Sequence, residues 1–174
     1  MRPMMTTTLG AALAIAASLS GTVRATPASG FVGTTLAVGR FGDIAVFNKL
    51  LPPDLRDDRR TRDLWLSWQR TSGDSDVYVQ SNVWATGGTT GWHTHPGHSL
   101  IIVTAGTVTV YEGHDPTCKP HVYTVGMGFV DAGGDHVHVI RNEGSVEART
   151  ITVQVIPAGA VRRVDAPDPG GCGF

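Results

Sequence analysis

Short runs of β-branched and aromatic residues, separated by Gly, Pro, Asp and Asn, recur along the chain between residues 31 and 157. This spacing favours strands over helices because helical periodicity is nearly absent. We expect strands at 31–39, 43–48, 64–70, 76–85, 99–106, 107–113, 120–125, 136–142 and 148–157. Many short strands at regular spacing predict an all-β fold, either a closed barrel or a sandwich-like one.

The N-terminal residues have the pattern of an export signal. Arg2 precedes an apolar stretch over residues 9–19, and a small-x-small sequence ends at Ala25. This pattern predicts a signal peptide over residues 1–25. The apolar part is shorter than the roughly 20 residues that a spanning helix needs. We therefore expect a secreted or extracytoplasmic protein that has no membrane association after cleavage.

The remaining residues 26–174 have the usual size of one domain. The whole chain carries 14 Lys and Arg against 15 Asp and Glu, for a formal net charge of −1. Such a balance gives no electrostatic attraction to nucleic acid or anionic lipid, so we expect neither as a partner.

The chain contains two cysteines, Cys118 and Cys172. An even number of cysteines in an exported protein favours a disulfide. A bridge between them would attach the Pro/Gly-rich C-terminal tail to the body of the domain. The charge-dense segment 54–63 is most simply a solvated loop or short helix, with a lid as the alternative, and the sequence does not decide its role.

The histidines are concentrated in one part of the chain. All seven lie between residues 93 and 138, at positions 93, 95, 98, 114, 121, 136 and 138. Residues i and i+2 of a strand point to the same face, so His93 and His95 can converge on one ion, and His136 and His138 repeat the spacing. Imidazole suits Fe, Ni, Cu and Zn, and less selectively Mn. The alternative is that the pairs are hydrogen-bonded structural residues, and we expect His98, His114 and His121 at the surface.

Two motifs in this region resemble those of the cupins. The first cupin motif is G-x5-H-x-H-x3-4-E-x6-G, and residues 87–106 match it at Gly87, His93, His95 and Gly106, with Ser99 at the glutamate position. The second is G-x5-P-x-G-x2-H-x3-N, and residues 127–142 match it more weakly. There His138 and Asn142 are in register, whereas Met127, Gly133 and Asp135 replace the glycine, proline and glycine. The resemblance implies a cupin-type double-stranded β-helix, or jelly-roll, barrel.

The resemblance also implies a metal site. In cupins the motif histidines usually bind one divalent transition metal, which nominates His93, His95 and His138 as ligands of Fe, Mn, Zn, Ni or Cu. Ser99 replaces the usual glutamate ligand, which implies weaker binding. The three glutamates of the chain are expected at strand ends or turns away from the motif; they are Glu112, Glu143 and Glu147. His136 is a candidate fourth ligand or a catalytic acid/base.

Three functions remain open from the sequence. The first is an exported metal-dependent enzyme acting on a small organic molecule, with dioxygenase-like chemistry the most familiar for such a site. The second is a non-catalytic cupin that binds a metal or a small ligand, and the third is a metal-free structural barrel. The resemblance further implies a homodimer, because small cupins commonly pair through their outer strands.

Strand alternation predicts part of the pocket wall. Ser99, Ile101 and Val103 should face inward, while Leu100 and Ile102 pack against the opposite layer. For residues 76–85 the inward face is undecided. It is either the polar-aromatic set Tyr78, Gln80, Asn82 and Trp84, or the set Val77, Val79, Ser81 and Val83.

Overall fold

The structure is a computed structural model that describes residues 25–50 and 65–174. The expected signal peptide, except for Ala25, and the charged segment 54–63 lie outside the described residues. The described residues form strands, turns and loops, and none of them belongs to a helix long and apolar enough to cross a membrane.

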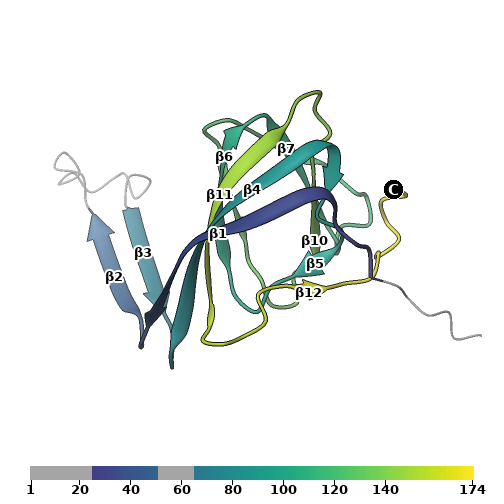
Figure 1. Ribbon diagram of the computed structural model, residues 1–174. Helices are drawn as coiled ribbons and strands as arrows, with labels where there is room; N and C mark the ends of the chain where they lie inside the picture. Colours follow the sequence, from purple (N-terminus) through teal and green to yellow (C-terminus); the bar gives the residue numbers. More distant parts are fainter. Residues whose placement is uncertain (1–24, 51–64) are drawn as a thin grey trace, which may run out of the picture.

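The strands are antiparallel to their partners and form two sheets (Figure 1). In chain order they are β1 (Ser29–Phe41), β2 (Ala45–Leu50), β3 (Trp65–Arg70), β4 (Ser75–Thr89), β5 (His93–Thr94), β6 (Ser99–Ala105), β7 (Thr107–Glu112), β8 (His121–Thr124), β9 (Gly128–Asp131), β10 (His138–Arg141), β11 (Ala148–Pro157) and β12 (Val164–Asp165). The larger sheet has 10 strands and curls into a nearly closed barrel, and the smaller one contains only β2 and β3. The all-β fold expected from the sequence is confirmed.

Strand β4 is the central element of the barrel. It pairs with β1 on one edge and with β11 on the other, and β11 pairs in turn with β6 and β6 with β9. The opposite wall contains β10, paired with β7, β5 and the end of β4. This arrangement places β5 and β10, which carry His93 and His138, next to each other on one wall.

The inward face of the barrel follows strand alternation. In β6, Ser99, Ile101 and Val103 are buried as predicted. Leu100 and Ile102, however, are 51% and 54% exposed, so the prediction that they pack against another layer is wrong. They lie on the outer surface, which no further layer covers within the described part of the chain.

Strand β4 presents its polar-aromatic face to the interior, which resolves the choice that the sequence left open. Asn82 and Trp84 are buried, and Gln80 also lines the interior cavity. A polar strand face is thus turned inward, and the interior differs from that of a barrel filled by aliphatic side chains.

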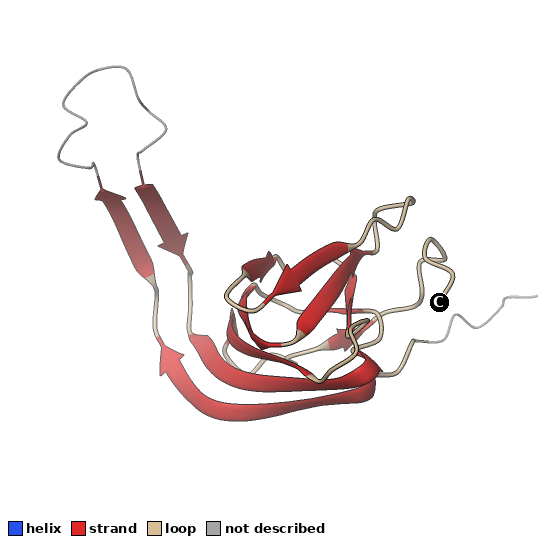
Figure 2. Cartoon of the chain, turned by 90° about the horizontal axis from the view of Figure 1, so that it is seen from above, coloured by secondary structure: helices blue, strands red, loops and turns tan. Residues whose placement is uncertain are grey.

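The hairpin of β2 and β3 projects from the barrel as an arm (Figure 2). The sequence places both strands correctly, but they do not contribute to the barrel wall. Large apolar side chains of the arm are exposed, with Trp68 at 75% the most exposed of them; the others are Val46, Phe47, Leu50, Trp65 and Leu66. We call this pair of strands the arm below.

Two apolar clusters hold the barrel together. One fills the interior between the walls and contains Trp84, Val103, Val108, Val110, Ile140 and Ala148. The other contains Trp92, Tyr111, Val139 and Ala166, with both cysteines packed against it. Phe174 lies against Trp92 and Tyr111, so the end of the chain is packed onto this second cluster.

The structure joins Cys118 to Cys172 in a disulfide, as the sequence predicted. The two cysteines are 54 positions apart, and the bridge attaches the C-terminal tail to the loop that follows β7. Because the bond closes a long loop, it restricts the unfolded chain strongly.

Removal of the disulfide should destabilise the fold. For a loop of this length the chain-entropy model predicts a loss of about 4 kcal/mol in the free energy of unfolding. We expect the double variant Cys118→Ser/Cys172→Ser to show this loss in urea unfolding monitored by circular dichroism. An unchanged unfolding midpoint would mean that the tail does not depend on the bridge.

Candidate metal centre

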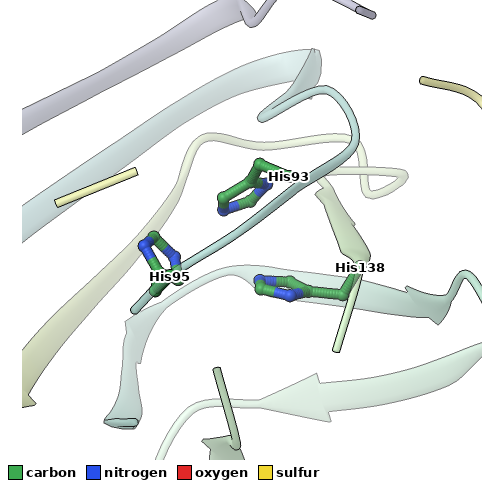
Figure 3. Close-up of side chains that lie close together, drawn as sticks. All are labelled: His93, His95 and His138. Carbon is green, nitrogen blue, oxygen red and sulfur yellow. The ribbon is translucent and has the colours of Figure 1, made fainter. Parts of the chain in front are cut away.

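The antiparallel pairing of β5 with β10 brings the two motifs together. His93 and His138 are direct partners in this ladder, and their ring centroids lie 4.4 Å apart. His95 completes the group, with its ring centroid 4.8 Å from that of His93 and 5.8 Å from that of His138. Figure 3 shows the three rings gathered around a common space. One nitrogen of each ring lies within 4.8 Å of the others, a separation at which one ion can contact all three.

Backbone carbonyls hold two of the rings in a defined tautomer. Nδ1 of His93 lies 2.9 Å from the carbonyl oxygen of Gly91, and Nδ1 of His95 lies 2.5 Å from that of Arg162. A carbonyl oxygen only accepts hydrogen bonds, so each Nδ1 carries the proton. In the neutral rings Nε2 therefore keeps its lone pair, as in metal-bound histidines whose other nitrogen is held by a carbonyl.

The surroundings of His138 also favour the tautomer with the proton on Nδ1. Its Nδ1 lies 3.4 Å from the carbonyl oxygen of His136 and 3.6 Å from Oδ1 of Asp131, both of which are acceptors. Its Nε2 is buried and has no hydrogen-bond partner among the described residues. A buried polar atom without a partner is costly, and a bound cation would satisfy it.

A carboxylate from a neighbouring strand lies beside two of the three histidines, His95 and His138. Asp131 of β9 is the direct partner of Ser99 in β6, and its Oδ2 lies 3.4 Å from both Ser99 Oγ and His95 Nε2. Its Oδ1 accepts a hydrogen bond from the backbone of Gly133 at 3.0 Å. Ser99 faces inward at the position where the motif has its glutamate. The carboxylate near the histidines comes instead from Asp131, the residue paired with Ser99 in the adjacent strand.

Sequence reasoning missed Asp131 because no strand was predicted between residues 126 and 135. The available signal was the alternation in the sequence GFVD over residues 128–131, which precedes the turn at Gly133 and Gly134. Without the pairing partner of β6, however, that short pattern does not show which side chain meets Ser99.

Burial keeps two of the rings neutral. Desolvation lowers the pKa of His93 far below its ordinary value, with the neighbouring His138 and Arg163 as further causes. Desolvation also lowers the pKa of His138 to about 4, although the negative charge of Asp131 opposes the shift. Neutral imidazole is the form that binds a metal.

The histidines open into an interior cavity of about 280 Å³. Besides the four groups of the centre, it is lined by apolar residues such as Phe31, Trp84 and Ile101 and by polar residues that include Asn82, Thr152, Gln154 and Arg162. This volume is near the lower end of the range for small-molecule sites, so the cavity fits a small molecule.

Arg162 connects the cavity wall to the centre. Its guanidinium donates hydrogen bonds to Gln154 at 3.0 Å, to Thr35 at 2.9 Å and to Gln80. Its backbone carbonyl holds His95, as described above. Arg162 therefore fixes the orientation of one ring and also places a cationic side chain at the cavity wall.

Other motif positions have structural roles. Asn142 is fully buried, and its Nδ2 lies 3.1 Å from the Trp84 and Ala85 carbonyls and 2.8 Å from that of Val146. Gly106 forms the turn between β6 and β7 at φ +64°, where a Cβ atom would lie 2.5 Å from the carbonyl oxygen of Glu147. These positions hold strand ends together.

His136 does not join the three-histidine group. Its ring lies 6.1 Å from that of His138, and its Nε2 lies 2.9 Å from Oε2 of Glu112. The expectation that Glu112 lies away from the motif is wrong, because Glu112 is the strand partner of His138. His98 and His121 are partly buried, whereas His114 is exposed. Of these three, only His114 belongs to a group of metal-binding side chains, together with Glu112 and His136.

No protein-family model matches the chain, and no curated protein matches its sequence. Solved structures of cupin type resemble it. A cupin-like protein from Thermotoga maritima has 22% identity and a TM-score of 0.46, with 53% of this chain and 65% of that chain covered. An oxalate oxidase has 24% identity and a TM-score of 0.40, with 47% of this chain and 46% of that chain covered. The polyketide cyclase RemF from Streptomyces resistomycificus has 18% identity and a TM-score of 0.44, with 53% of this chain and 64% of that chain covered.

The chain spans less than two thirds of each of these three proteins, and the similarity concerns the fold. The described strands form a nearly closed antiparallel β-barrel, which is the fold class expected from the motif resemblance. The histidine-lined interior is the feature that gives this barrel a candidate function.

The buried histidines should make stability depend on pH. Their pKa values are lower in the folded chain than the ordinary 6.5, so the unfolded chain binds more protons between about pH 4 and 6.5. Stability should therefore fall as the pH decreases through this window, by up to about 1.4 kcal/mol per pH unit for each histidine. Urea unfolding of chelator-treated protein at pH 7 and pH 5 measures this difference.

A suitable control is His121→Ala, which removes a histidine outside the centre and should preserve the pH dependence. A free energy of unfolding that does not change between the two pH values would contradict the burial of neutral rings.

Proposed function

We propose that the barrel binds one divalent transition metal through His93, His95 and His138, with Asp131 as the anionic ligand. The main support is the convergence of the three rings, above all the buried Nε2 of His138 that has no partner among the described residues. Three imidazoles and a carboxylate suit Fe, Mn, Ni, Cu or Zn, and the donor set does not select one of them.

The carboxylate of Asp131 raises the metal affinity above the one expected from the sequence. Ser99 alone would leave the centre with neutral ligands, whereas Asp131 supplies a negative charge beside His95. A charged oxygen ligand offsets the charge of the cation in a site that is largely removed from water. We therefore propose a resident metal in preference to a metal-free structural barrel.

The proposed activity is metal-dependent, dioxygenase-like conversion of a small organic molecule in the interior cavity. A bound metal would supply Lewis-acid or redox chemistry at the histidine cluster. The chain's own residues would orient the substrate, through the polar side chains of Asn82, Gln154 and Arg162, and exclude water with the apolar remainder of the wall. The alternative is a non-catalytic barrel that binds a metal or a small ligand in the same cavity.

We also propose that the protein is exported and acts outside the cytoplasm. The signal-like pattern of residues 1–25 supports this, together with the disulfide, because such bonds persist in oxidising compartments.

Replacement of one ligand should remove the metal without unfolding the barrel. His95 is the least buried of the three rings, so His95→Ala should leave the fold intact while the metal content, measured by elemental analysis, falls by about one equivalent per chain. Circular dichroism checks the fold. Equal metal content in His95→Ala and the parent protein would reject the centre.

Oxygen uptake then separates the enzyme from the binding protein. The metal-loaded parent should consume oxygen with a member of a panel of phenolic and diketone compounds, and His95→Ala should not. Metal binding without turnover of any compound would favour the non-catalytic alternative.

We propose in addition that the protein forms a homodimer in which the arm is covered. An isolated two-stranded hairpin is marginally stable in water, and this one exposes Phe47, Trp65 and Trp68 among other apolar side chains. The same chain carries an uncovered apolar strip on its barrel, at Leu100, Ile102 and Val130. A twofold axis can pair the arm of each copy with the strip of the other, which closes the assembly at two subunits.

Light scattering at tens of micromolar should give the mass of two chains, and the variant Phe47→Ser/Trp68→Ser should give the mass of one. A monomeric mass for the parent protein would reject the dimer.

A further inference from the structure

A second cluster of metal-binding side chains lies outside the three-histidine centre. Glu112 ends β7, His114 lies in the turn after it, and His136 lies just before β10. One oxygen or nitrogen atom from each of the three lies within 4.8 Å of the others. A further group, Asp131 with His136 and His138, shares Asp131 and His138 with the centre described above and is therefore not an independent site.

The contact between Glu112 and His136 is short but is not a hydrogen bond. Oε2 of Glu112 lies 2.9 Å from Nε2 of His136, yet this oxygen is buried and has no partner in hydrogen-bond geometry among the described residues. Nδ1 of His136 is also buried and unpaired within the described part of the chain. Two atoms that bind the same metal ion lie about this far apart, and each directs its lone pair at the ion and not at the other atom. The contact between Glu112 and His136 has this character.

The surroundings leave room for an ion and for water. His114 and His136 line a cavity of about 500 Å³ that is separate from the interior one, and Asp135 adds a carboxylate to its wall. The C-terminal tail forms the opposite side through Ala166, Pro167 and Pro169. Two of the three proposed ligands line this cavity, so an ion held by them keeps coordination positions open toward it.

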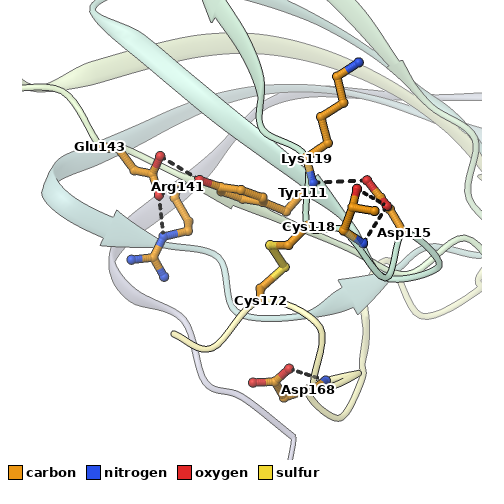
Figure 4. The surroundings of a disulfide bond; sticks show 10 residues. Tyr111, Asp115, Cys118, Lys119, Arg141, Glu143, Asp168 and Cys172 are labelled. Carbon is orange, nitrogen blue, oxygen red and sulfur yellow. Dashed lines mark hydrogen bonds and ion pairs between the residues drawn. A yellow bond between two sulfur atoms is a disulfide. The ribbon is translucent and has the colours of Figure 1, made fainter.

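The elements that carry the cluster are fixed in place. The His114 turn continues into the loop around Asp115, whose carboxylate accepts hydrogen bonds from the backbone of Thr117 at 2.9 Å and of Lys119 at 3.0 Å. Figure 4 shows this loop next to the disulfide between Cys118 and Cys172. The same bridge holds the tail, so both sides of the cavity are attached to each other before any ion binds.

We propose that Glu112, His114 and His136 form a second metal site, which takes a borderline divalent cation such as Zn²⁺. Two imidazoles and one carboxylate are a donor set that Zn²⁺ accepts readily, and the ion would satisfy the buried oxygen of Glu112. Binding joins the turn after β7 to the segment before β10, and it gives His136, which lies outside the three-histidine group, a metal to bind.

The test is equilibrium dialysis of the full chain, freed of metal and of any histidine tag, against increasing Zn²⁺. The parent protein should bind two equivalents. His114→Ala removes an exposed side chain and should bind one fewer, or bind the second with a Kd at least about tenfold weaker. Glu112→Gln keeps the shape of the side chain but not its charge, and should show the same loss.

The matched control is His121→Ala, which removes a partly buried histidine that belongs to neither cluster and should bind as the parent does. His95→Ala should lose the inner ion and retain the outer one, so failure of the inner centre and failure of the outer site give different results. If His114→Ala and Glu112→Gln both bind as many equivalents as the parent with unchanged Kd, the second site does not exist.

Discussion

The pairing of β10 with β5 is the constraint on which the interior of this protein depends. It aligns His138 with His93 although the two residues are 45 positions apart, and the same strand β10 is held on its other edge by β7. The rings then meet because residues paired across an antiparallel ladder share a face. A shift of one residue in either pairing would turn His138 away from the other rings and disperse the cluster.

The buried polar groups impose an energetic demand on the barrel. Three imidazoles, a carboxylate and the amide-rich face of β4 occupy space that aliphatic side chains would fill in a purely structural barrel. Removing such groups from water is costly unless each finds a partner. Here backbone carbonyls satisfy one side of the rings, and the side facing the cavity is left for a ligand, which is the pattern expected when polar burial serves binding.

Local sequence patterns predicted what depends on neighbouring residues, and they failed where distant residues meet. The His-x-His spacing and the alternation of Ser99, Ile101 and Val103 define a strand face without knowledge of its partners. Asp131 could not be assigned in this way, because its role comes from its position opposite Ser99 in a different strand. The proximity of Glu112 to His136 likewise depends on the register between β7 and β10. The arm has an ordinary strand pattern, and nothing in that pattern shows that it leaves the barrel.

The arm has a consequence for how the molecule opens. β2 and β3 form their ladder only with each other, whereas the strands that carry the histidines belong to one continuous sheet. Two regions whose ladders are not joined to each other behave as separate cooperative units, each with its own opening free energy. The hydrogen bonds of the arm can therefore break and reform many times while the strands that carry the histidines stay paired. The slowest amide hydrogen exchange should accordingly be found in β4, β10 and β11.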